Sequence, residues 1–334
     1  MRKYNIAIDA MGGDNAPEEM VYGAIQSARQ IDVNVLLVGD LDQIKRHIAD
    51  PIPDGIRLIP SYGVIAENEH PLEAFRTKPK ASIITAAGLI KEGMADALVT
   101  MGSTGAAMAA GVMILGTMEG IERPALGGPF LGLAPKTTLV DLGTSMDNRP
   151  SQLLNYGVLG SVFATVFHGI DNPSVALLSV GAEEGKGNRQ VREAYSLFSK
   201  SKLNFIGNVE GMDIPYSKAD VVVCDGFVGN ILMKFTEGLG SAMVDYLRTD
   251  TGGLNLSDEK LTDLTNLTNY VEYKGGGPLL GLNGVVIVGH GRSKADSVVA
   301  AVEMACVALE KNFVDMIKDN LAEIRSIVTE GEEN

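Results

Sequence analysis

The sequence predicts an α/β protein with a mostly parallel sheet covered by helices on both faces. Short apolar runs, typical of buried strands, alternate with longer stretches in which apolar residues recur with a period of about 3.6. Hydrophobic residues make up 45% of the 334 residues, which suffices for a well-buried core. The 39 glycines indicate many tight turns. We therefore expect a three-layer arrangement of helices, sheet and helices.

The expected strands are the short apolar runs, and the expected helices lie between them. The strands cover Asn5–Ile8, Val33–Val38, Ile56–Ile59, Ala97–Val99, Thr138–Val140, Val175–Val180, Asn204–Ile206, Val221–Cys224 and Val285–Val288. The helical period recurs over Pro17–Arg29, Ser82–Glu92, Ser151–Phe167 and Gln190–Lys200. The Pro- and Gly-rich segment Arg123–Lys136 interrupts this alternation, as a β excursion or a subunit contact would. No linker or internal repeat divides residues 1–334, so we expect a single large domain.

A polar helical excursion is expected at about residues 250–273. Leu261, Leu264 and Leu267 recur at every third position among polar residues, which gives a narrow apolar stripe. Lys260 is the sole basic residue of Leu254–Tyr270, whereas membrane-surface helices are usually rich in Lys and Arg. The pattern favours a solvated helix packed along one edge of the protein.

Charge and cysteine content exclude several classes of protein. The net charge of −14 argues against nonspecific binding to nucleic acid or anionic lipid. Cys224 and Cys306 have no metal-like spacing, and Cys224 lies in an apolar run, as a core residue would. The sequence shows neither a signal-peptide pattern nor an apolar stretch long enough to span a membrane. We therefore expect a cytoplasmic protein.

Three apolar runs each end on an aspartate that glycine follows closely. These units are Asp9 with Gly12 and Gly13, Asp141 with Gly143, and Asp225 with Gly226. An Asp at such a position can cap the next helix, but ligands also bind where the carboxyl ends of parallel strands meet. Because the unit occurs three times, we favour a shared binding site, with Asp14 and Asn230 close to it.

Three glycine-rich loops are candidate sites for an anion. The first, Gly102-Ser103-Thr104-Gly105, follows a strand and opens a helix, so its N–H groups and hydroxyls can face a phosphate. An ordinary helix cap would have the same sequence. The second, Gly181–Asn188, contains Lys186 between two glycines, but its glycine spacing is not that of a nucleotide P-loop. A solvated turn would also fit Lys186.

The third loop is Gly289-His290-Gly291, which follows the strand Val285–Val288. A histidine between two glycines is open to a ligand and can act as a hydrogen-bond donor or as an acid or base. No dinucleotide fingerprint, metal-ligand cluster or Ser/His/Asp order is present. The sequence therefore predicts noncovalent handling of a small anion.

Six motifs in consistent order resemble the phosphate acyltransferase (PlsX) family. They are D-A-M-G-G-D from Asp9, G-S-T-G from Gly102, G-x-E-x-x-K-G-N from Gly181, N-F-I-G-N-V-E from Asn204, A-D-V-V-V-C-D-G-F-V-G-N from Ala219, and G-H-G from Gly289. The resemblance runs from Asp9 to about Ala301. It implies that an acyl group passes from acyl carrier protein to inorganic phosphate, with no metal or nucleotide cofactor. The closest alternative is a phosphotransacetylase-like enzyme that uses acyl-CoA.

The resemblance also implies a homodimer and a fold similar to isocitrate and isopropylmalate dehydrogenases and to phosphotransacetylase. A membrane-bound glycerol-3-phosphate acyltransferase is an expected partner, which would place the enzyme at the membrane periphery. For this chemistry we expect Lys186, Asn188, Ser103 and Thr104 to hold phosphate, and His290 to donate a proton. Asp225 and Asn230 would orient neighbouring groups, and Lys234 lies one helical turn beyond. Acyl carrier protein is acidic, so we expect it to dock on Arg76, Lys78 and Lys80, although these could equally form a solvated face.

Overall fold

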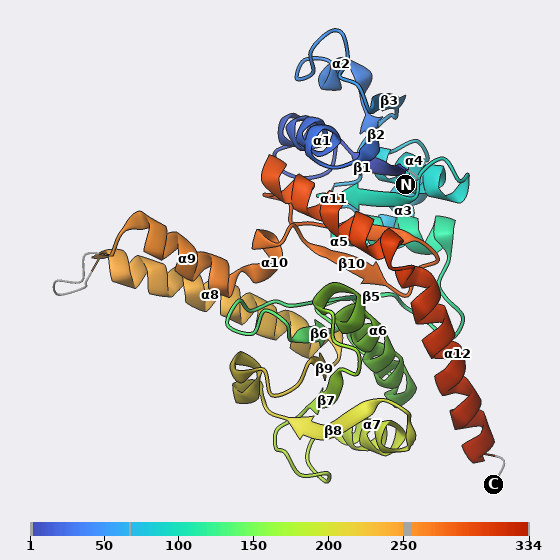
Figure 1. The fold of residues 1–334 in the computed structure, drawn as a ribbon, viewed down its shortest axis with the longest axis vertical. Helices are drawn as coiled ribbons and strands as arrows, with labels where there is room; N and C mark the ends of the chain where they lie inside the picture. The colour runs from blue at the N-terminus through green and yellow to red at the C-terminus, as the bar shows by residue number, and fades with distance from the viewer. Residues whose placement is uncertain (1–2, 67, 250–255, 333–334) are drawn as a thin grey trace. The chain divides into compact units, whose positions relative to one another are not determined.

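The computed structural model describes residues 3–66, 68–249 and 256–332 (Figure 1). The chain forms two compact units, each built around its own set of paired strands. Unit 1 comprises Met1–Met118 and Lys274–Val314, and unit 2 comprises Glu119–Tyr273 and Asp315–Asn334. The α/β class predicted from the sequence is confirmed in both units. That residues 1–334 act as a single domain stays a prediction.

The strands of unit 1 are almost all parallel. In spatial order they are β3 (Ile56–Pro60), β2 (Val33–Gly39), β1 (Tyr4–Asp9), β4 (Ala97–Thr100), β11 (Val285–Val288) and β10 (Gly277–Leu280). Only β10 runs antiparallel to its neighbour β11. Ile8 pairs with Val99, which in turn pairs with Ile287, so three central strands end at one edge.

Two groups of helices pack against the sheet of unit 1. In the first group, α1 (Glu18–Gln30) lies against α11 (Ala295–Glu310), and Gly23 permits this contact because a Cβ there would lie 2.5 Å from the Cβ of Val298. In the second group, α4 (Ser82–Lys91) contacts α5 (Thr104–Ala110) and its π-helical continuation η1 (Gly111–Leu115). The remaining helices of unit 1 are α2 (Leu41–Ile44) and α3 (Pro71–Thr77), while α12 (Phe313–Glu332) begins in unit 1 and continues in unit 2.

Unit 2 contains the strands β5 (Ala125–Gly128), β6 (Thr138–Val140), β9 (Val221–Val223), β7 (Ser174–Leu178) and β8 (Asn204–Val209), in that spatial order. β6, β9, β7 and β8 are parallel, and β5 is antiparallel to β6. β5 comes from the Pro- and Gly-rich segment, so its interpretation as a β excursion is confirmed.

Helices cover both faces of the sheet in unit 2. On one face α6 (Pro150–His168) approaches closely, since a Cβ at Gly160 would meet Val221 and Val140. α6 also contacts α7 (Arg189–Lys200). On the other face, Leu139 and Val222 belong to a core cluster that also contacts Leu232 and Met233 of α8. This arrangement is the predicted three-layer order of helix, sheet and helix.

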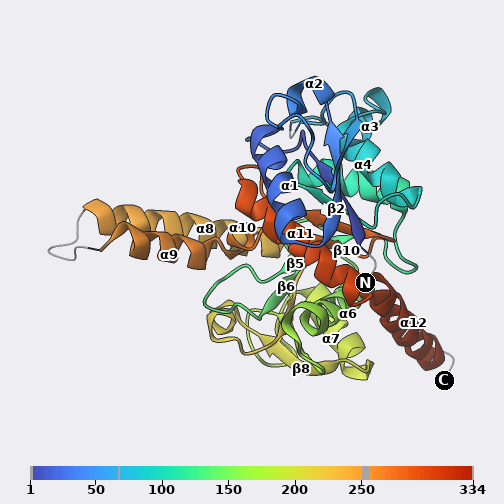
Figure 2. The same ribbon diagram turned by 45° about the horizontal axis from the view of Figure 1, so that its top comes forward.

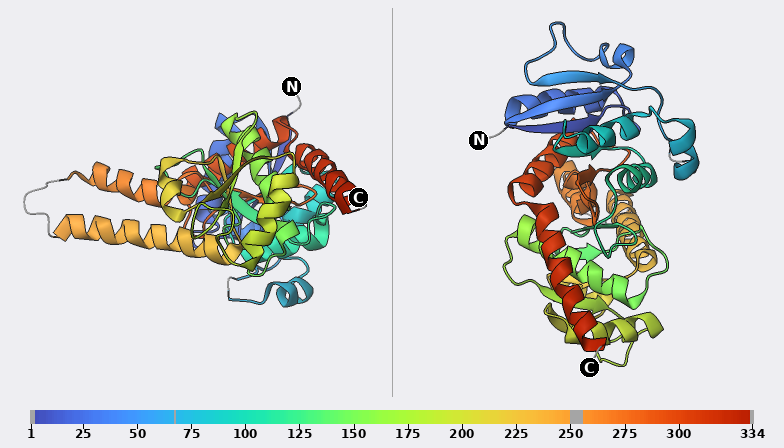
Figure 3. Two further views of the ribbon diagram at one scale, coloured as in Figure 1. Left: turned by 90° about the horizontal axis from the view of Figure 1, so that it is seen from below. Right: turned by 90° about the vertical axis from the view of Figure 1, so that its right-hand side faces the viewer.

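A helical hairpin extends from unit 2. It consists of α8 (Gly226–Thr249) and α9 (Asp258–Thr268), which lie side by side (Figure 2 and Figure 3), and α10 (Tyr270–Tyr273) follows. Gly240 allows the close approach, because any Cβ there would overlap Thr268. The predicted polar excursion is thus α9 with α10, while residues 250–255 lie outside the described residues. Among the described helices, none is long and apolar enough to cross a membrane.

Candidate functional site

Three loops meet at the carboxyl ends of β1, β4 and β11 in unit 1. The backbone N–H of Asp14 donates to the carbonyl of Gly291 at 2.6 Å, and that of Gly289 donates to the carbonyl of Thr100 at 2.9 Å. The Asn15 side chain donates to the carbonyls of Arg292 and Ser293 at 3.1 and 3.2 Å. The D-A-M-G-G-D, G-S-T-G and G-H-G motifs therefore lie together, as the sequence predicted.

Asp9 holds two of these loops together through Thr100. The Thr100 hydroxyl donates to Asp9 Oδ2 at 2.9 Å and accepts from the N–H of Gly102 at 3.0 Å. Asp9 Oδ1 accepts from the N–H of Met11 at 3.1 Å. Only 2% of Asp9 is exposed, and burial raises the pKa of its carboxyl group above 3.8, against the lowering effect of its hydrogen bonds. Asp9 therefore shapes the loops and does not face solvent.

The glycines after β1 are required by the closeness of the two loops. A Cβ at Gly12 would lie 2.7 Å from Asp9 Oδ2 and 2.8 Å from the N atom of Gly102. Gly13 has φ +104°, a conformation that side chains disfavour, and a Cβ there would lie 3.0 Å from the carbonyl oxygens of Gly291 and Met101. The two glycines of the D-A-M-G-G-D motif thus allow the backbones of neighbouring loops to pack closely against each other.

The outer surface of this loop cluster carries the other predicted residues of unit 1. Ser103 caps α5 by accepting from the N–H of Ala106 at 3.3 Å, which is the ordinary role that the sequence left open. Asp14, Thr104 and Gly105 are exposed, and His290 is half-buried. His290 Nδ1 is buried without a hydrogen-bond partner among the described residues. That these groups contact a ligand stays a prediction.

Asp141 organises the corresponding loop of unit 2. Its carboxylate accepts from the N–H groups of Leu126, Gly143, Thr144 and Ser145 at 2.9 to 3.3 Å, and from the Thr144 hydroxyl at 2.7 Å. The residue is 0% exposed, and burial raises the pKa of its carboxyl group against the opposing effect of these hydrogen bonds. Asp141 is therefore a buried anchor for the loop.

The start of α8 packs against this anchored loop. The N–H of Gly226 donates to the carbonyl of Ser145 at 2.8 Å, and a Cβ at Gly229 would overlap the carbonyl oxygen of Asp141. Asp225 accepts from the N–H of Val228 at 2.8 Å, so it caps α8, the alternative role that the sequence allowed. The side chain of Asn230 lies against Gly143. A Cβ added at Gly143 would be 3.2 Å from Asn230 Oδ1.

The loop Gly181–Asn188 follows β7 and presents Lys186 to solvent. The structure shows no ion pair or hydrogen bond of the Lys186 ammonium with other described residues, and its side-chain stem lies over Gly181. Asn188 caps α7 by accepting from the N–H of Val191 at 2.9 Å. The Lys186 ammonium, which has no partner among the described residues, therefore lies close in sequence to the N-terminus of α7. A helix N-terminus is a favourable place for an anion.

Sequence reasoning missed two residues that shape these loops. Thr100 joins Asp9 to Gly102, and Asn208 of β8 donates to the carbonyl of Glu183 at 2.9 Å, which supports the Lys186 loop from below. Asn208 is 5% exposed. A polar residue close to the carboxyl end of a predicted strand was the available signal in both cases.

The remaining predicted residues have more ordinary surroundings. Lys234 is exposed and lies 3.3 Å from Glu237 on the same helix. Burial raises the pKa of the Cys224 thiol well above its usual value, in agreement with the prediction that Cys224 is a core residue. Within the described parts of the chain, no group of three or more His, Cys, Asp or Glu residues could hold a metal ion.

The basic cluster of unit 1 is partly neutralised. Lys78 donates to Glu69 Oε2 at 2.6 Å and to the carbonyl of Val64 at 2.8 Å. Lys80 lies 5.8 Å from the centre of the Tyr62 ring, a cation–π contact. Arg76 is exposed. Of the three predicted docking residues, Arg76 and Lys80 thus keep an accessible charge while Lys78 is bound within the protein.

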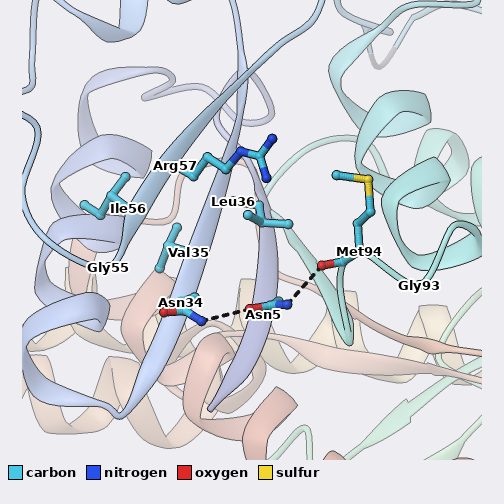
Figure 4. A pocket seen from close by; sticks show the side chains of 9 residues that line it. All are labelled: Asn5, Asn34, Val35, Leu36, Gly55, Ile56, Arg57, Gly93 and Met94. Carbon is cyan, nitrogen blue, oxygen red and sulfur yellow. Dashed lines mark hydrogen bonds between the residues drawn. The ribbon is translucent and has the colours of Figure 1, made fainter. Parts of the chain in front are cut away.

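A cavity of about 460 Å³ lies in unit 1, at the opposite ends of the strands from the candidate site of that unit (Figure 4). It is lined by residues at the amino ends of β1, β2 and β3, among them Asn5, Asn34 and Arg57, together with Met94. Asn34 donates to Asn5 Oδ1 at 2.9 Å, and Asn5 donates to the carbonyl of Met94 at 3.1 Å. None of the predicted site residues lines it.

The structure places the predicted residues in two groups, one in each unit. Unit 1 brings together the loops of Asp9, Ser103 and His290. Unit 2 joins the Asp141 loop to the start of α8, which carries Asn230, and holds Lys186 on the next strand over. The convergence of both groups on one ligand stays a prediction.

Solved structures with a similar fold include two kinds of enzyme. A phosphotransacetylase from Streptococcus pyogenes has a TM-score of 0.63 at 17% identity, covering 92% of this chain and 94% of that one. A 4-hydroxythreonine-4-phosphate dehydrogenase from Klebsiella pneumoniae has a TM-score of 0.55 at 16% identity, covering 92% and 98%. These identities establish a shared fold only. The likeness to isocitrate dehydrogenase stays a prediction.

Sequence comparison gives the family. The family model described as "Fatty acid synthesis protein" matches residues 4–316. A phosphate acyltransferase from Desulfitobacterium hafniense (strain DSM 10664 / DCB-2) is 44% identical over 326 residues, covering 95% of this chain and 97% of that protein. One from Heliobacterium modesticaldum is 42% identical with the same coverage. The chain belongs to the phosphate acyltransferase family, and it is an acyltransferase.

Proposed function

We propose that the protein transfers a fatty acyl group from acyl carrier protein to inorganic phosphate, giving acyl phosphate for phospholipid synthesis. A phosphate oxygen bonds to the thioester carbonyl carbon, the carbon–sulfur bond breaks, and the carrier leaves as a thiol after taking up a proton. The observation that carries the proposal is the 44% identity to a phosphate acyltransferase across 95% of the chain.

Lys186 is the cation that we assign to phosphate. It is exposed, its ammonium has no partner in the described structure, and α7 begins at Arg189 just beyond it. Ser103 and Thr104 supply hydroxyls, and the exposed Gly105 leaves its backbone open to close approach, while Gly12 and Gly13 let the neighbouring loops pack closely behind them. Because phosphate is already an anion at neutral pH, positioning and charge stabilisation can provide most of the rate acceleration.

His290 is our candidate proton donor to the carbonyl oxygen or to the departing thiolate. Its Nδ1 atom is buried and has no hydrogen-bond partner in the described structure, so no protein group in that part of the chain occupies this nitrogen. Asp225 and Asn230 would orient neighbouring groups, with Lys234 and Asn188 contributing charge and an amide. His290→Gln should lower kcat more than it raises the KM for phosphate; an unchanged kcat would remove His290 from the mechanism.

The identity of the acyl donor is tested by trapping the product. Hydroxylamine converts acyl phosphate to a hydroxamate, which can be measured with palmitoyl acyl carrier protein or palmitoyl-CoA as donor. We expect phosphate-dependent hydroxamate with the carrier protein at a kcat/KM at least about tenfold above that with acyl-CoA. A preference for acyl-CoA would favour the phosphotransacetylase-like alternative. No hydroxamate from either donor would contradict both.

The docking of acyl carrier protein is assigned to Arg76 and Lys80, with Lys78 in a supporting role. The two exposed cations suit an acidic partner, and charge pairs of this kind act mainly on association. Arg76→Glu combined with Lys80→Glu should raise the KM for the carrier but not that for phosphate. Lys200→Glu, which reverses an exposed charge on α7, is the matched control. Equal effects of the double variant on both KM values would refute the assignment.

The homodimer is assigned to α8. Ile231, Phe235, Leu239 and Met243 recur every fourth residue and are 49%, 64%, 47% and 43% exposed, so they form an apolar stripe along the helix. A second copy of the stripe would cover it. We expect the wild type to have the mass of a dimer by light scattering, and Phe235→Glu to shift it toward the monomer. A monomeric wild type would contradict the assignment.

We assign the enzyme to the cytoplasm, at the periphery of the membrane through its product. Acyl phosphate is consumed by a membrane-bound glycerol-3-phosphate acyltransferase in this proposal. The protein should cosediment with vesicles that contain this acyltransferase and remain in the supernatant with vesicles that lack it. Cosedimentation with both kinds of vesicle to the same extent would show that the protein binds lipid and not the acyltransferase.

A further inference from the structure

Each of the four parallel strands of unit 2 is followed by a large apolar side chain that is exposed. In spatial order of the strands these residues are Met146 after β6, Phe227 after β9, Val180 after β7 and Met212 after β8. They are 51%, 57%, 83% and 70% exposed, respectively. We refer to these four residues as the apolar row.

Backbone hydrogen bonds show that neighbouring members of the apolar row come from adjoining loops. The N–H of Gly226 donates to the carbonyl of Ser145 at 2.8 Å, and the next residues along are Phe227 and Met146. The N–H of Ser179, directly before Val180, donates to the carbonyl of Val209 at 2.9 Å. Met212 follows three residues later.

The middle of the row is joined by strand pairing. β9 pairs with β7 through Val223 and Leu177, so the segment that leads into α8, where Phe227 is the second residue, begins beside the loop that carries Val180. Neighbouring strands lie about 4.8 Å apart, so four strands in succession extend over roughly 14 Å. The apolar row therefore follows the carboxyl edge of the sheet.

The row lies beside the candidate site of unit 2. The stem of Lys186 lies over Gly181, which is next to Val180. Met146 is next to Ser145, whose N–H group is bound by Asp141 at 2.9 Å. Exposed apolar side chains on neighbouring segments often mark a binding surface, and methionine adapts its shape to apolar ligands.

We propose that the apolar row binds the hydrocarbon chain of the acyl donor. The inference rests on the proposed function, and it adds where in unit 2 the chain lies. A linear chain suits a row that is one side chain wide, whereas a specific protein interface buries about 800 Å² on each partner. The four side chains of the row offer only a few hundred Å² by themselves, so we assign a hydrocarbon chain to them. Phe227 lies one helical turn before Ile231 on α8, so a second copy is the alternative occupant that the test must separate.

The test uses one carrier protein loaded with either a sixteen-carbon or a four-carbon acyl group. The variant is Val180→Ser with Met212→Ser, two residues at least 70% exposed, so folding should be preserved. We expect the KM for the sixteen-carbon donor to rise about tenfold, since each lost methylene contact weakens binding, and the KM for the four-carbon donor to stay within about twofold. Leu133→Ser, 59% exposed on the loop that leads into β6, is the matched control and should change neither KM.

Two results would overturn the proposal. Equal changes for both donors would mean that the row contacts the carrier or a second copy, and light scattering of the variant would separate these occupants. No change for either donor would mean that the row does not contact the substrate.

A direct binding measurement separates failure of the row from failure of the proposed function. A fluorescent sixteen-carbon fatty acid should bind the wild type and Leu133→Ser equally well. It should bind the Val180→Ser, Met212→Ser variant about tenfold more weakly, even if the protein makes no acyl phosphate. Equal binding by all three proteins would contradict the proposal without involving catalysis.

Discussion

The two units each have a buried aspartate at the end of a strand, but the two carboxylates organise their surroundings differently. Asp9 accepts one backbone N–H and the Thr100 hydroxyl, and so connects the loops that follow β1 and β4. Asp141 accepts four backbone N–H groups and the Thr144 hydroxyl. All of these donors except the N–H of Leu126 belong to the loop that follows Asp141 itself. The same residue type thus joins two loops in unit 1 and stiffens one loop in unit 2.

This difference predicts that Asp141 contributes more to stability than Asp9. Asp141→Ala would leave five donors, most of them partly buried, without their acceptor, and we expect it to lower the free energy of unfolding by about 4 kcal/mol. Asp9→Ala removes an acceptor from two donors and should cost about 2 kcal/mol. Urea unfolding followed by circular dichroism measures both values. Equal losses would show that the number of donors does not decide the contribution.

The glycines around the two aspartates allow a second comparison. Gly229→Ala would force a methyl group into the carbonyl of Asp141, which is backbone and cannot turn away, so we expect a loss of roughly 3 kcal/mol. Gly12→Ala meets the Asp9 carboxylate and the Thr100 hydroxyl as well as backbone, and side chains can shift, so the loss should be about 2 kcal/mol. Gly238→Ala, with open space around its Cβ, is the control. A reversed order would contradict the rigidity assigned to the Asp141 loop.

Thr100 provides a smaller and more specific test of the link between loops in unit 1. Thr100→Val keeps the shape of the side chain but removes the hydroxyl that bonds both Asp9 and Gly102, so stability should fall by about 1 to 2 kcal/mol and the KM for phosphate should rise. Thr100→Ser keeps the hydroxyl and should restore the KM. If the serine variant behaved like the valine variant, the hydrogen-bonded link would not be the relevant feature.

The pH dependence of Asp9 gives the smallest expected effect. Its pKa is raised above 3.8 in the folded protein, so the unfolded chain loses this proton at lower pH than the folded protein does. The contribution of Asp9 to the free energy of unfolding therefore falls as the pH rises through the raised pKa. Asp9→Asn lacks this contribution, so its stability relative to wild type should increase between about pH 4 and pH 7. A constant difference over this range would contradict the raised pKa.

Much of the fold could be predicted because local patterns determine it. The apolar runs became strands within a few residues of their expected bounds, and the aspartates and glycines at their ends lie at the loops where the sequence placed them. The positions of Thr100 and Asn208 near strand ends were a signal, but their partners Asp9 and Glu183 could not be predicted, because they are 91 and 25 residues away in the sequence. The neutralisation of Lys78 by Glu69 likewise depends on how one loop folds back. Periodicity carries no information on such contacts.

The proposed reaction depends on phosphate binding by Lys186. Its most direct test is the KM for phosphate of Lys186→Ala in the hydroxamate assay, with Lys200→Ala at the other end of α7 as the control. We predict at least about a tenfold rise for Lys186→Ala and none for the control, because a charge-assisted contact to the anion is lost. An unchanged KM and kcat in Lys186→Ala would contradict the account.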